Sequence, residues 1–280
     1  MWQRTLDQLN ASRHPRGGWG YLAGQSPVGE ATLLALAAGA EGDPAWLDQE
    51  ELGWSVLMAP SCLSLRFPDR AQAAIAPLLT LKGDPGGLSA GTYDASILGW
   101  AWVDGTFSWV EPTAWAVLSL RRQGLDGNPR CAEGLRLLVD RQCSDGGWNS
   151  GNPDVLGAEL PGYLYAAGLC AMALPPGDSV DKALKFAEGV RSAPSVMNLS
   201  FAILARLRHG RDPTVEVRLL LERQESDGLF STRMDRNALA ILALRAAEEG
   251  SSPLFDSAFD SEFDAPSDTP VDAPPEVPHG

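Results

Sequence analysis

Runs of small apolar residues recur along the chain and alternate with more polar segments. They lie at 30–40, 112–124, 162–174, 195–210 and 235–247. Their apolar side chains recur every three to four residues, which predicts helices, whereas the period of two that is typical of strands is missing over any useful length. Gly and Pro separate the runs, as in LDGNP at 125–129. We therefore expect an all-α fold.

A turn pattern recurs between these segments. Residues 138–147 read LVDRQCSDGG and residues 221–229 read LERQESDGL. The copies share a glutamine, a glycine and an aromatic residue, which are Gln142, Gly146 and Trp148 in the first and Gln224, Gly228 and Phe230 in the second. Related turns precede Trp19 and Trp109, and the four aromatic residues are spaced by one or two units of roughly 42 residues, a length that fits one helical hairpin.

Two kinds of helix are expected from each repeat. The helices after the turns are rich in Ala and Gly and nearly uncharged, which suits a crowded inner layer. The helices before them carry charges on one face, such as Arg136, Asp140 and Arg218, which suits an outer layer. We expect five to six hairpins to close into a double ring, an α/α toroid, over residues 1–250.

The repeat resembles that of a known superfamily. Residues 134–148, G-x-x-L-L-x-x-x-Q-x-x-x-G-x-W, resemble the QW repeat of squalene and oxidosqualene cyclases, with Leu137 where an aromatic residue is usual. EPTAWAVLSL at 111–120 is similar to the inner-helix openings of these cyclases and of protein prenyltransferase β subunits. The resemblance covers roughly residues 1–250 and implies a terpenoid cyclase-like toroid with a central cavity for an isoprenoid.

The reactive motifs of that superfamily are missing. The chain has neither the D-x-D-D motif of cyclases that protonate their substrate nor the D-D-x-x-D magnesium motif. None of the four cysteines follows an aspartate by two positions, as in the zinc site of the prenyltransferases. We therefore expect no metal and no cofactor, and whether the protein is an enzyme stays open.

One aromatic stretch carries the candidate chemistry. Asp94 and Glu111 are candidate catalytic acids, because a desolvated carboxylic acid can be held protonated. Aromatic faces stabilise a developing cation, and the candidate ligand-binding residues are Tyr93, Trp100, Trp102 and Trp109. The alternative is that these aromatic residues fill the core and that Glu111 only favours the start of a helix.

Carboxylates also recur just before the inner helices. They are Glu30, Glu111, Glu159 and Asp235. A toroid would bring them to one rim of its cavity. A ring of acids would repel a diphosphate, although each one alone is explained by the helix dipole.

Charge and composition limit the remaining functions. The net charge of −14 argues against a nucleic-acid partner, and no run reaches the roughly 18 apolar residues of a membrane span. The four widely spaced cysteines fit reduced thiols of a cytoplasmic protein.

The C-terminal residues differ in composition from the body. From residue 251 the sequence is rich in Pro and acidic residues and contains no Lys or Arg, so we expect residues 251–280 to form a largely disordered tail. Phe255, Phe259 and Phe263 recur every four residues and could dock on a partner protein as one helical stripe.

Two functions remain open from the sequence. In the first, the toroid acts on or binds an isoprenoid or other lipid-like molecule through a site without the usual motifs. In the second, it is a non-catalytic scaffold that works through its rim or its tail. The fold alone does not decide between them.

Overall fold

The computed structural model describes residues 2–49, 53–84, 91–189 and 194–255, and they are mostly helical. The prediction of a mostly helical body is confirmed. The strands among the described residues are β1 (Asp154–Val155) and β2 (Ala158–Glu159), which form one short antiparallel hairpin.

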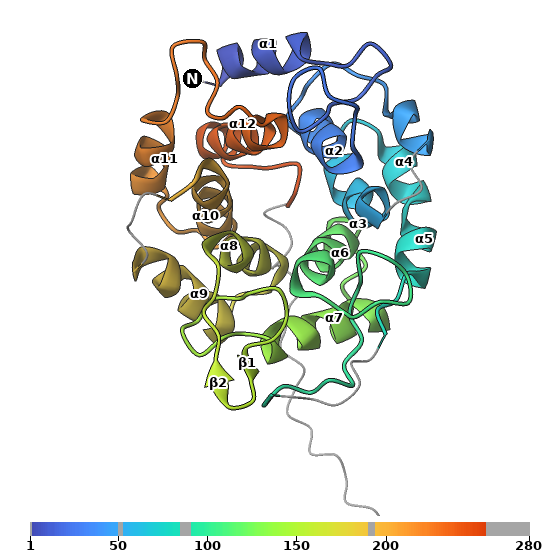
Figure 1. Cartoon of the computed structure of the whole chain (residues 1–280), viewed down its shortest axis with the longest axis vertical. Coiled ribbons are helices and arrows are strands. Elements are labelled where there is room, and N and C mark those ends of the chain that lie inside the picture. Colours follow the sequence, from blue (N-terminus) through green and yellow to red (C-terminus); the bar gives the residue numbers. More distant parts are fainter. Residues whose placement is uncertain (1, 50–52, 85–90, 190–193, 256–280) are drawn as a thin grey trace, which may run out of the picture.

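One set of helices lies nearest the centre of the molecule in Figure 1, and most of their described side chains are buried. These are α2 (Gly29–Ala37), α3 (Gly53–Cys62), α6 (Val110–Arg122), α8 (Leu164–Ala173), α10 (Val196–Arg208) and α12 (Met234–Glu249). The predicted apolar runs account for all of them except α3. Pro60 lies inside α3 and weakens its helical signal, because proline lacks the N–H that a helix interior uses.

The central helices follow one another around the molecule. Each packs against the next in the order α2, α3, α6, α8, α10 and α12, and α12 packs against α2. Small residues permit this packing. A Cβ atom at Gly168 in α8 would lie only 2.9 Å from the carbonyl carbon of Phe201 in α10, so glycine allows the two backbones to approach.

A second set of helices lies outside the first (Figure 1). It comprises α1 (Gln3–Ala11), α4 (Pro68–Ala73), α5 (Ile75–Thr80), α7 (Pro129–Asp140), α9 (Asp178–Gly189) and α11 (Thr214–Leu221), with a short 3-10 helix, η1 (Pro44–Gln49). Helices α7, α9 and α11 pack on α6, α8 and α10, and α1 packs on α12. In α7 the buried residues recur every three to four positions, as expected of a helix with one covered face.

The two copies of the repeated turn make matching contacts. The side-chain amide of Gln142 donates to the carbonyl oxygens of Gly146 (2.9 Å) and Ser179 in α9 (2.8 Å). That of Gln224 donates to the carbonyl oxygen of Gly228 (3.0 Å) and to the hydroxyl of Thr5 in α1 (3.1 Å). The glycines have φ of +91° and +92°, a region that favours glycine. Each glutamine thus ties its turn to the adjacent outer helix.

The second aromatic position of the repeat is Trp100, and the prediction that placed Trp109 there is wrong. The indole N–H groups of Trp19, Trp100 and Trp148 each donate to a leucine carbonyl oxygen in the preceding outer helix, at 2.7, 2.8 and 2.6 Å. Trp109 instead directly precedes α6, and its backbone N–H donates to the carbonyl oxygen of Trp100 at 3.0 Å. The sequence assignment failed because the loop before α6 carries a second tryptophan nine residues later.

Packing continues beyond residue 250, where we expected the tail to begin. Helix α12 ends at Gly250, and the chain then turns back toward the centre (Figure 1). Ser252, Leu254 and Phe255 are buried. Phe255 is therefore packed in this structure rather than presented to a partner, while Phe259 and Phe263 lie outside the described residues. No described helix is both long and apolar enough to cross a bilayer.

Candidate functional site

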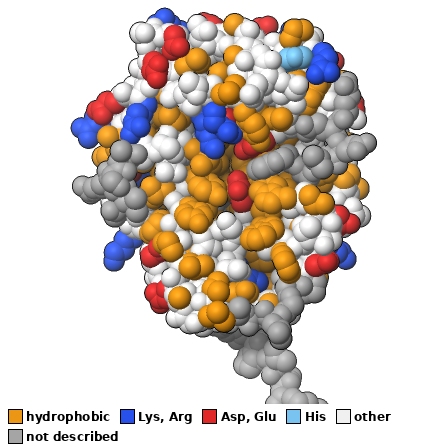
Figure 2. All heavy atoms as spheres, viewed as in Figure 1, with side chains coloured by type: hydrophobic (Ala, Val, Ile, Leu, Met, Phe, Trp, Pro, Cys, Tyr) orange, Lys and Arg blue, Asp and Glu red, His pale blue; other side chains and the backbone are white. Residues whose placement is uncertain are grey.

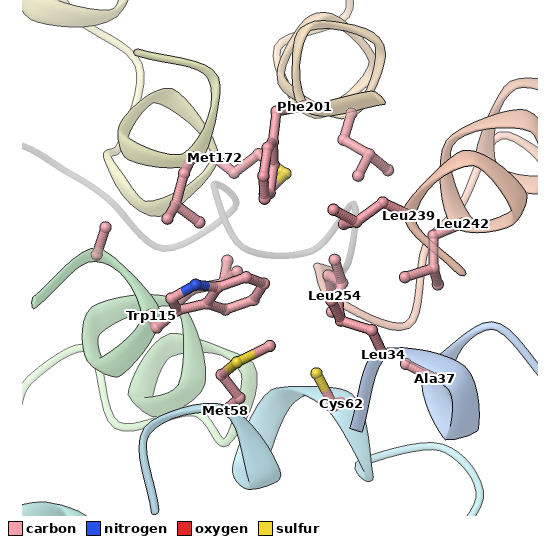
Figure 3. Packing of buried hydrophobic residues seen from close by; sticks show 14 of the residues in the cluster. Leu34, Ala37, Met58, Cys62, Trp115, Met172, Phe201, Leu239, Leu242 and Leu254 are labelled. Atoms are coloured by element: carbon pink, nitrogen blue, oxygen red, sulfur yellow. The ribbon is translucent and has the colours of Figure 1, made fainter. Parts of the chain in front are cut away.

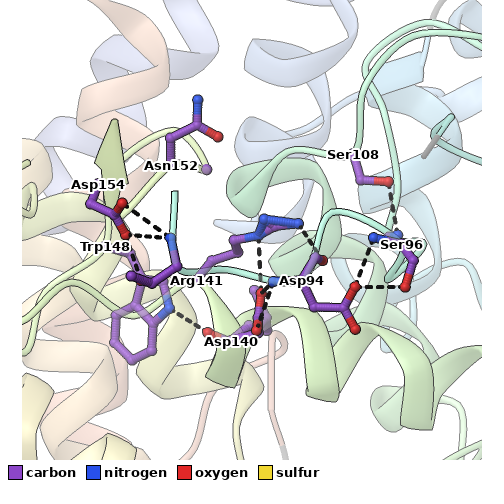
Figure 4. A network of polar contacts seen from close by, with 12 residues as sticks. Asp94, Ser96, Ser108, Asp140, Arg141, Trp148, Asn152 and Asp154 are labelled. Carbon is purple, nitrogen blue, oxygen red and sulfur yellow. Dashed lines mark hydrogen bonds and ion pairs between the residues drawn. The ribbon is translucent and has the colours of Figure 1, made fainter. Parts of the chain in front are cut away.

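Asp94 is exposed and lies next to Asp140 and Arg141 at the end of α7 (Figure 4). The Asp94 carboxylate accepts hydrogen bonds from the backbone N–H and the hydroxyl of Ser96, at 2.9 and 2.6 Å, and these bonds lower its pKa. Its backbone is held by Asp140 and Arg141 at the end of α7, and the Arg141 guanidinium lies 4.1 Å from the centre of the Tyr93 ring. Both residues therefore fix a turn against an outer helix.

Trp100 and Trp102 also have structural surroundings. Trp100 is fully buried, and its ring lies 4.1 Å from the guanidinium carbon of Arg130 in α7. Trp102 is partly buried against the hydrophobic core. Among the predicted candidates, Trp109 and Glu111 lie at the start of the central helix α6. Asp94 lies elsewhere, against the end of the outer helix α7.

Glu111 lies in the first turn of α6, directly after Trp109. A carboxylate at this position interacts favourably with the helix dipole. Its pKa is nevertheless raised to about 7, mainly by burial and also by the charge of Glu30, while the charge of Arg236 acts in the opposite direction. Glu111 is therefore a carboxyl group that exchanges its proton near neutral pH.

Three of the four predicted rim carboxylates occupy matching positions. Glu30, Glu111 and Asp235 each lie in the first turn of a central helix, α2, α6 and α12. The fourth, Glu159, is exposed on β2 and accepts a hydrogen bond from the Ser144 hydroxyl at 2.8 Å. The insertion of the β hairpin before α8 moves this acid away from the helix start.

Basic and phenolic groups surround the three acids. The fully buried Asp235 carboxylate contacts the guanidinium groups of Arg233 (2.9 Å) and Arg236 (3.3 Å). Glu30 accepts a hydrogen bond from the Tyr21 hydroxyl at 2.7 Å. Its pKa is raised by burial, which the Tyr21 bond partly offsets, and the charge of Asp235 raises it further.

Tyr165 from α8 completes the group. Its pKa is raised to about 12, first by burial and then by the charge of Glu111. We call the following set the mouth: Tyr21, Glu30, Glu111, Tyr165, Asp235 and Arg236. The face shown in Figure 2 has acidic side chains at its centre, surrounded by hydrophobic ones.

Two polar groups of the mouth have no partner within the described part of the chain. The Nη1 atom of Arg236 is buried without a hydrogen bond. Glu111 makes no hydrogen bond or ion pair with another described residue, and Arg236 acts on it only through its charge. The buried Nη1 donor of Arg236 is a group that a polar ligand atom could satisfy, because buried polar atoms are nearly always bonded, and the partly exposed carboxyl group of Glu111 can form a hydrogen bond beside it.

Apolar side chains from the central helices point toward one another in the core (Figure 3). Trp115 and Phe201 make an edge-to-face contact with ring centres 6.2 Å apart, and their exposed fractions are 2% and 3%. Leu254 lies among these side chains and is fully buried. These side chains therefore belong to the hydrophobic core.

The described residues offer no metal site and no reactive thiol. No group of three or more His, Cys, Asp or Glu side chains could hold a metal ion within the described ranges. All four cysteines are free and buried, and burial raises the pKa of the Cys62 and Cys131 thiols to about 12. The polar groups that the mouth presents are carboxyl, phenol and guanidinium groups, which can form hydrogen bonds.

Arg236 and the two tyrosines of the mouth were absent from the sequence candidates. The signal that could have found Arg236 is its place directly after Asp235, in the first turn of the last apolar run. Tyr21 and Tyr165 have no such signal, because their contacts with Glu30 and Glu111 depend on how neighbouring central helices are arranged.

Comparisons with known proteins add little to this picture. No family profile matches the chain, and no curated protein matches it. Among solved structures, the chain is similar to one described as the crystal structure of a protein from Actinoplanes, with 17% sequence identity and a TM-score of 0.49 over 89% of this chain and 74% of that chain. Proposals about function therefore rest on the chain's own residues.

Proposed function

We propose that this chain is an α/α toroid of the terpenoid cyclase and protein prenyltransferase type that binds an isoprenoid or other lipid-like small molecule at its mouth. The toroid is supported by the order of central helices that returns to α2, by the outer helices that cover them, and by the matching glutamine contacts of the two repeats. The QW-like sequence at 134–148 supports the family.

The observation that carries the function is the pair of unpartnered polar groups in an apolar setting. Glu111 and the Nη1 atom of Arg236 can hold one polar group of a ligand. The surrounding hydrophobic side chains favour an apolar remainder (Figure 2). An apolar surface with a few convergent polar groups is the usual form of a small-molecule site.

The charges of the mouth favour a ligand with a neutral polar group. Asp235 already engages Arg233 and Arg236, and Glu30 and Glu111 add further acidic groups. A diphosphate would be repelled by these carboxylates. A protonated Glu111 can donate a hydrogen bond to an alcohol, ether or carbonyl oxygen, and it can also deliver a proton to such a group.

The test is native mass spectrometry of the protein purified from its host at pH 6 and at pH 8. We expect a bound small molecule that is retained better at pH 6, where Glu111 is protonated. Glu111→Gln, whose amide also donates a hydrogen bond, should remove this pH dependence. Asp94→Asn is the matched control, because Asp94 lies outside the mouth, and it should behave as the wild type does. Absence of any bound molecule, or equal retention at both pH values, would contradict the proposal.

A second candidate, the non-catalytic scaffold, is favoured by the burial of the apolar side chains between the central helices. Trp115, Phe201 and Leu254 are at most 3% exposed. If no molecule is bound at either pH and Glu111→Gln changes only stability, the scaffold is the better explanation.

A further inference from the structure

The first copy of the repeated turn differs in charge from the two copies that contain Gln142 and Gln224. Aligned on their glycines, residues 13–19 read RHPRGGW, whereas the later copies read QCSDGGW and QESDGLF. Arg13 therefore stands where the later copies have glutamine, and Arg16 stands where they have aspartate. The net charge of the chain is −14, so this local gain of positive charge runs against its overall composition.

The three turns nevertheless have the same backbone. In each, the residue after the glutamine position donates its N–H to a carbonyl oxygen four residues later, at 3.0, 2.9 and 2.8 Å. The first glycine of each turn has nearly the same φ, which is +89° at Gly17, +91° at Gly146 and +92° at Gly228. The turns differ in side chains alone, and their side-chain contacts can be compared position by position.

The aspartate of the later turns has a structural task that Arg16 does not perform. The carboxylates of Asp145 and Asp227 each accept a hydrogen bond from the N–H two residues later, at 2.9 Å in both turns. In the first turn this N–H belongs to the buried Gly18, and it donates to no residue that the structure describes. A guanidinium group carries only donors and cannot accept from it. An acceptor from outside the chain can take the place of the missing carboxylate.

A cavity of about 440 Å³ lies against this turn, and Arg13, His14 and Arg16 all line it. Nη1 of Arg13 donates to the carbonyl oxygen of Glu41 at 3.0 Å, which leaves the other guanidinium N–H groups for a ligand. The Arg16 N–H donates to Nδ1 of His14 at 3.1 Å, so the neutral imidazole carries its proton on Nε2 and can donate from there. Donors from three side chains thus meet at one cavity.

Asp43 and Trp46 also line the cavity. The Asp43 carboxylate accepts the N–H of Ala45 at 2.8 Å. The Trp46 ring packs against the turn, because a Cβ atom at Gly18 would lie only 3.0 Å from its Cδ2 atom. Two arginines therefore outnumber one aspartate here, and an aromatic ring lies beside them. This combination suits a small anion that carries an organic group.

We propose that the first repeated turn binds the phosphoryl group of a small soluble phosphate ester. Phosphate oxygens can accept from the Gly18 N–H and from the guanidinium groups of Arg13 and Arg16 together, and arginine matches phosphate geometry well. The organic part of the ester then packs on Trp46. A lipid headgroup offers the same phosphoryl chemistry, but the net charge of −14 repels an anionic membrane surface. This site is separate from the mouth and does not depend on the proposed function.

The test is a titration of the isotope-labelled full chain with phenyl phosphate, followed by nuclear magnetic resonance. The Gly18 amide reports on the proposed bond directly, because an N–H proton that gains a hydrogen bond shifts downfield. We expect a saturable downfield shift with phenyl phosphate and weaker binding of inorganic phosphate, which has no group to place on Trp46. Sodium chloride at the same ionic strength should cause no such shift.

Arg16→Asp restores the residue of the two later turns. The new carboxylate should accept the Gly18 N–H, so the melting temperature should equal or exceed that of the wild type. The affinity for phenyl phosphate should fall by about tenfold or more, because a hydrogen-bonded charge is lost and a like charge replaces it. Arg223→Asp is the matched control, since it makes the same change at another exposed arginine, and it should bind as the wild type does.

Several results would overturn the proposal. They are a Gly18 proton that responds to neither phosphate, an Arg16→Asp variant that binds as tightly as the wild type, and an equal loss in Arg223→Asp. A clear fall in the melting temperature of Arg16→Asp would also contradict it, because the Gly18 N–H would then be unable to take a carboxylate. Sedimentation with phosphatidylcholine vesicles, with and without phosphatidic acid, tests the other source. Binding that requires phosphatidic acid and is lost in Arg16→Asp would replace the soluble ester by a lipid headgroup, and absence of vesicle binding supports the soluble ester.

Discussion

The raised pKa of Glu111 predicts that this residue destabilises the folded protein above neutral pH. In the unfolded chain the group has its ordinary pKa of 4.5, whereas in the folded protein the pKa is about 7. Below pH 4.5 the carboxyl group is protonated in both states. Between pH 4.5 and 7 the unfolded state releases the proton and the folded state keeps it, so the free energy of unfolding falls as the pH rises. Above pH 7 both states are ionised and the loss is complete.

The size of the effect follows from the two pKa values. Each unit of difference corresponds to about 1.36 kcal/mol, so the loss between pH 4.5 and pH 7 is about 3 kcal/mol. Glu111→Gln removes the ionisation. The free energy of unfolding of the variant minus that of the wild type should therefore be greater at pH 8 than at pH 4 by up to about 3 kcal/mol. For a protein of this size that is a rise in melting temperature of roughly 6 °C.

The assay is urea unfolding of the two proteins at half-unit steps from pH 4 to pH 8, with Glu222→Gln as control. Glu222 is an exposed residue. The difference in unfolding free energy between Glu111→Gln and the wild type should increase with pH and level off near pH 7, and the control difference should stay flat. A difference that decreases with pH would refute the reasoning, because it would mean that ionised Glu111 is held by a favourable partner.

Three further substitutions test the packing. Trp100→Ala should destabilise the protein by about 3–5 kcal/mol in urea unfolding. Trp109→Ala should have a smaller effect, because its ring is only half buried. If Trp109→Ala were the more destabilising of the two, Trp109 would be restored as the repeat position. Gly168→Ala should cost about 1–3 kcal/mol by forcing α8 away from α10, whereas Gly127→Ala, with open space around it, should be nearly neutral. Gln142→Ala should lower stability by about 1–3 kcal/mol through the loss of two hydrogen bonds, and an unchanged melting temperature would show that the turn does not depend on them.

The helices were largely predictable from the sequence, because the central ones consist of long runs of Ala and Leu that only burial can explain. The exception was α3, whose sequence contains Pro60 and has no repeat turn before it. The equivalence of the Gln142 and Gln224 contacts was also predictable, because the two copies of the turn share Gln, Gly and an aromatic residue at equal spacing. The sequence did not predict which tryptophan occupies the aromatic position of the second repeat. Trp100 and Trp109 both follow glycine-containing turns, and only the indole hydrogen bond of Trp100 distinguishes them.

The candidate site was predicted only in part. Glu111 and the rim carboxylates followed from their positions before the apolar runs, and three of the four lie where that argument placed them. Asp94 was chosen for its nearness to aromatic residues in the sequence, but the hydrogen bonds from Ser96 hold it in a surface turn. The role of Arg236 depends on which groups lie across from it in space, and that information is not contained in local spacing.

The hydrogen bond between Gln224 and Thr5 joins the last repeated turn to the first helix. These residues are 219 positions apart. During synthesis α1 is made long before α12, on which it packs. Helix α1 therefore keeps an uncovered apolar face until α12 has been made, and their docking must close a loop of more than two hundred residues. We expect this step to limit the rate of folding and to make incomplete chains the form most prone to aggregate.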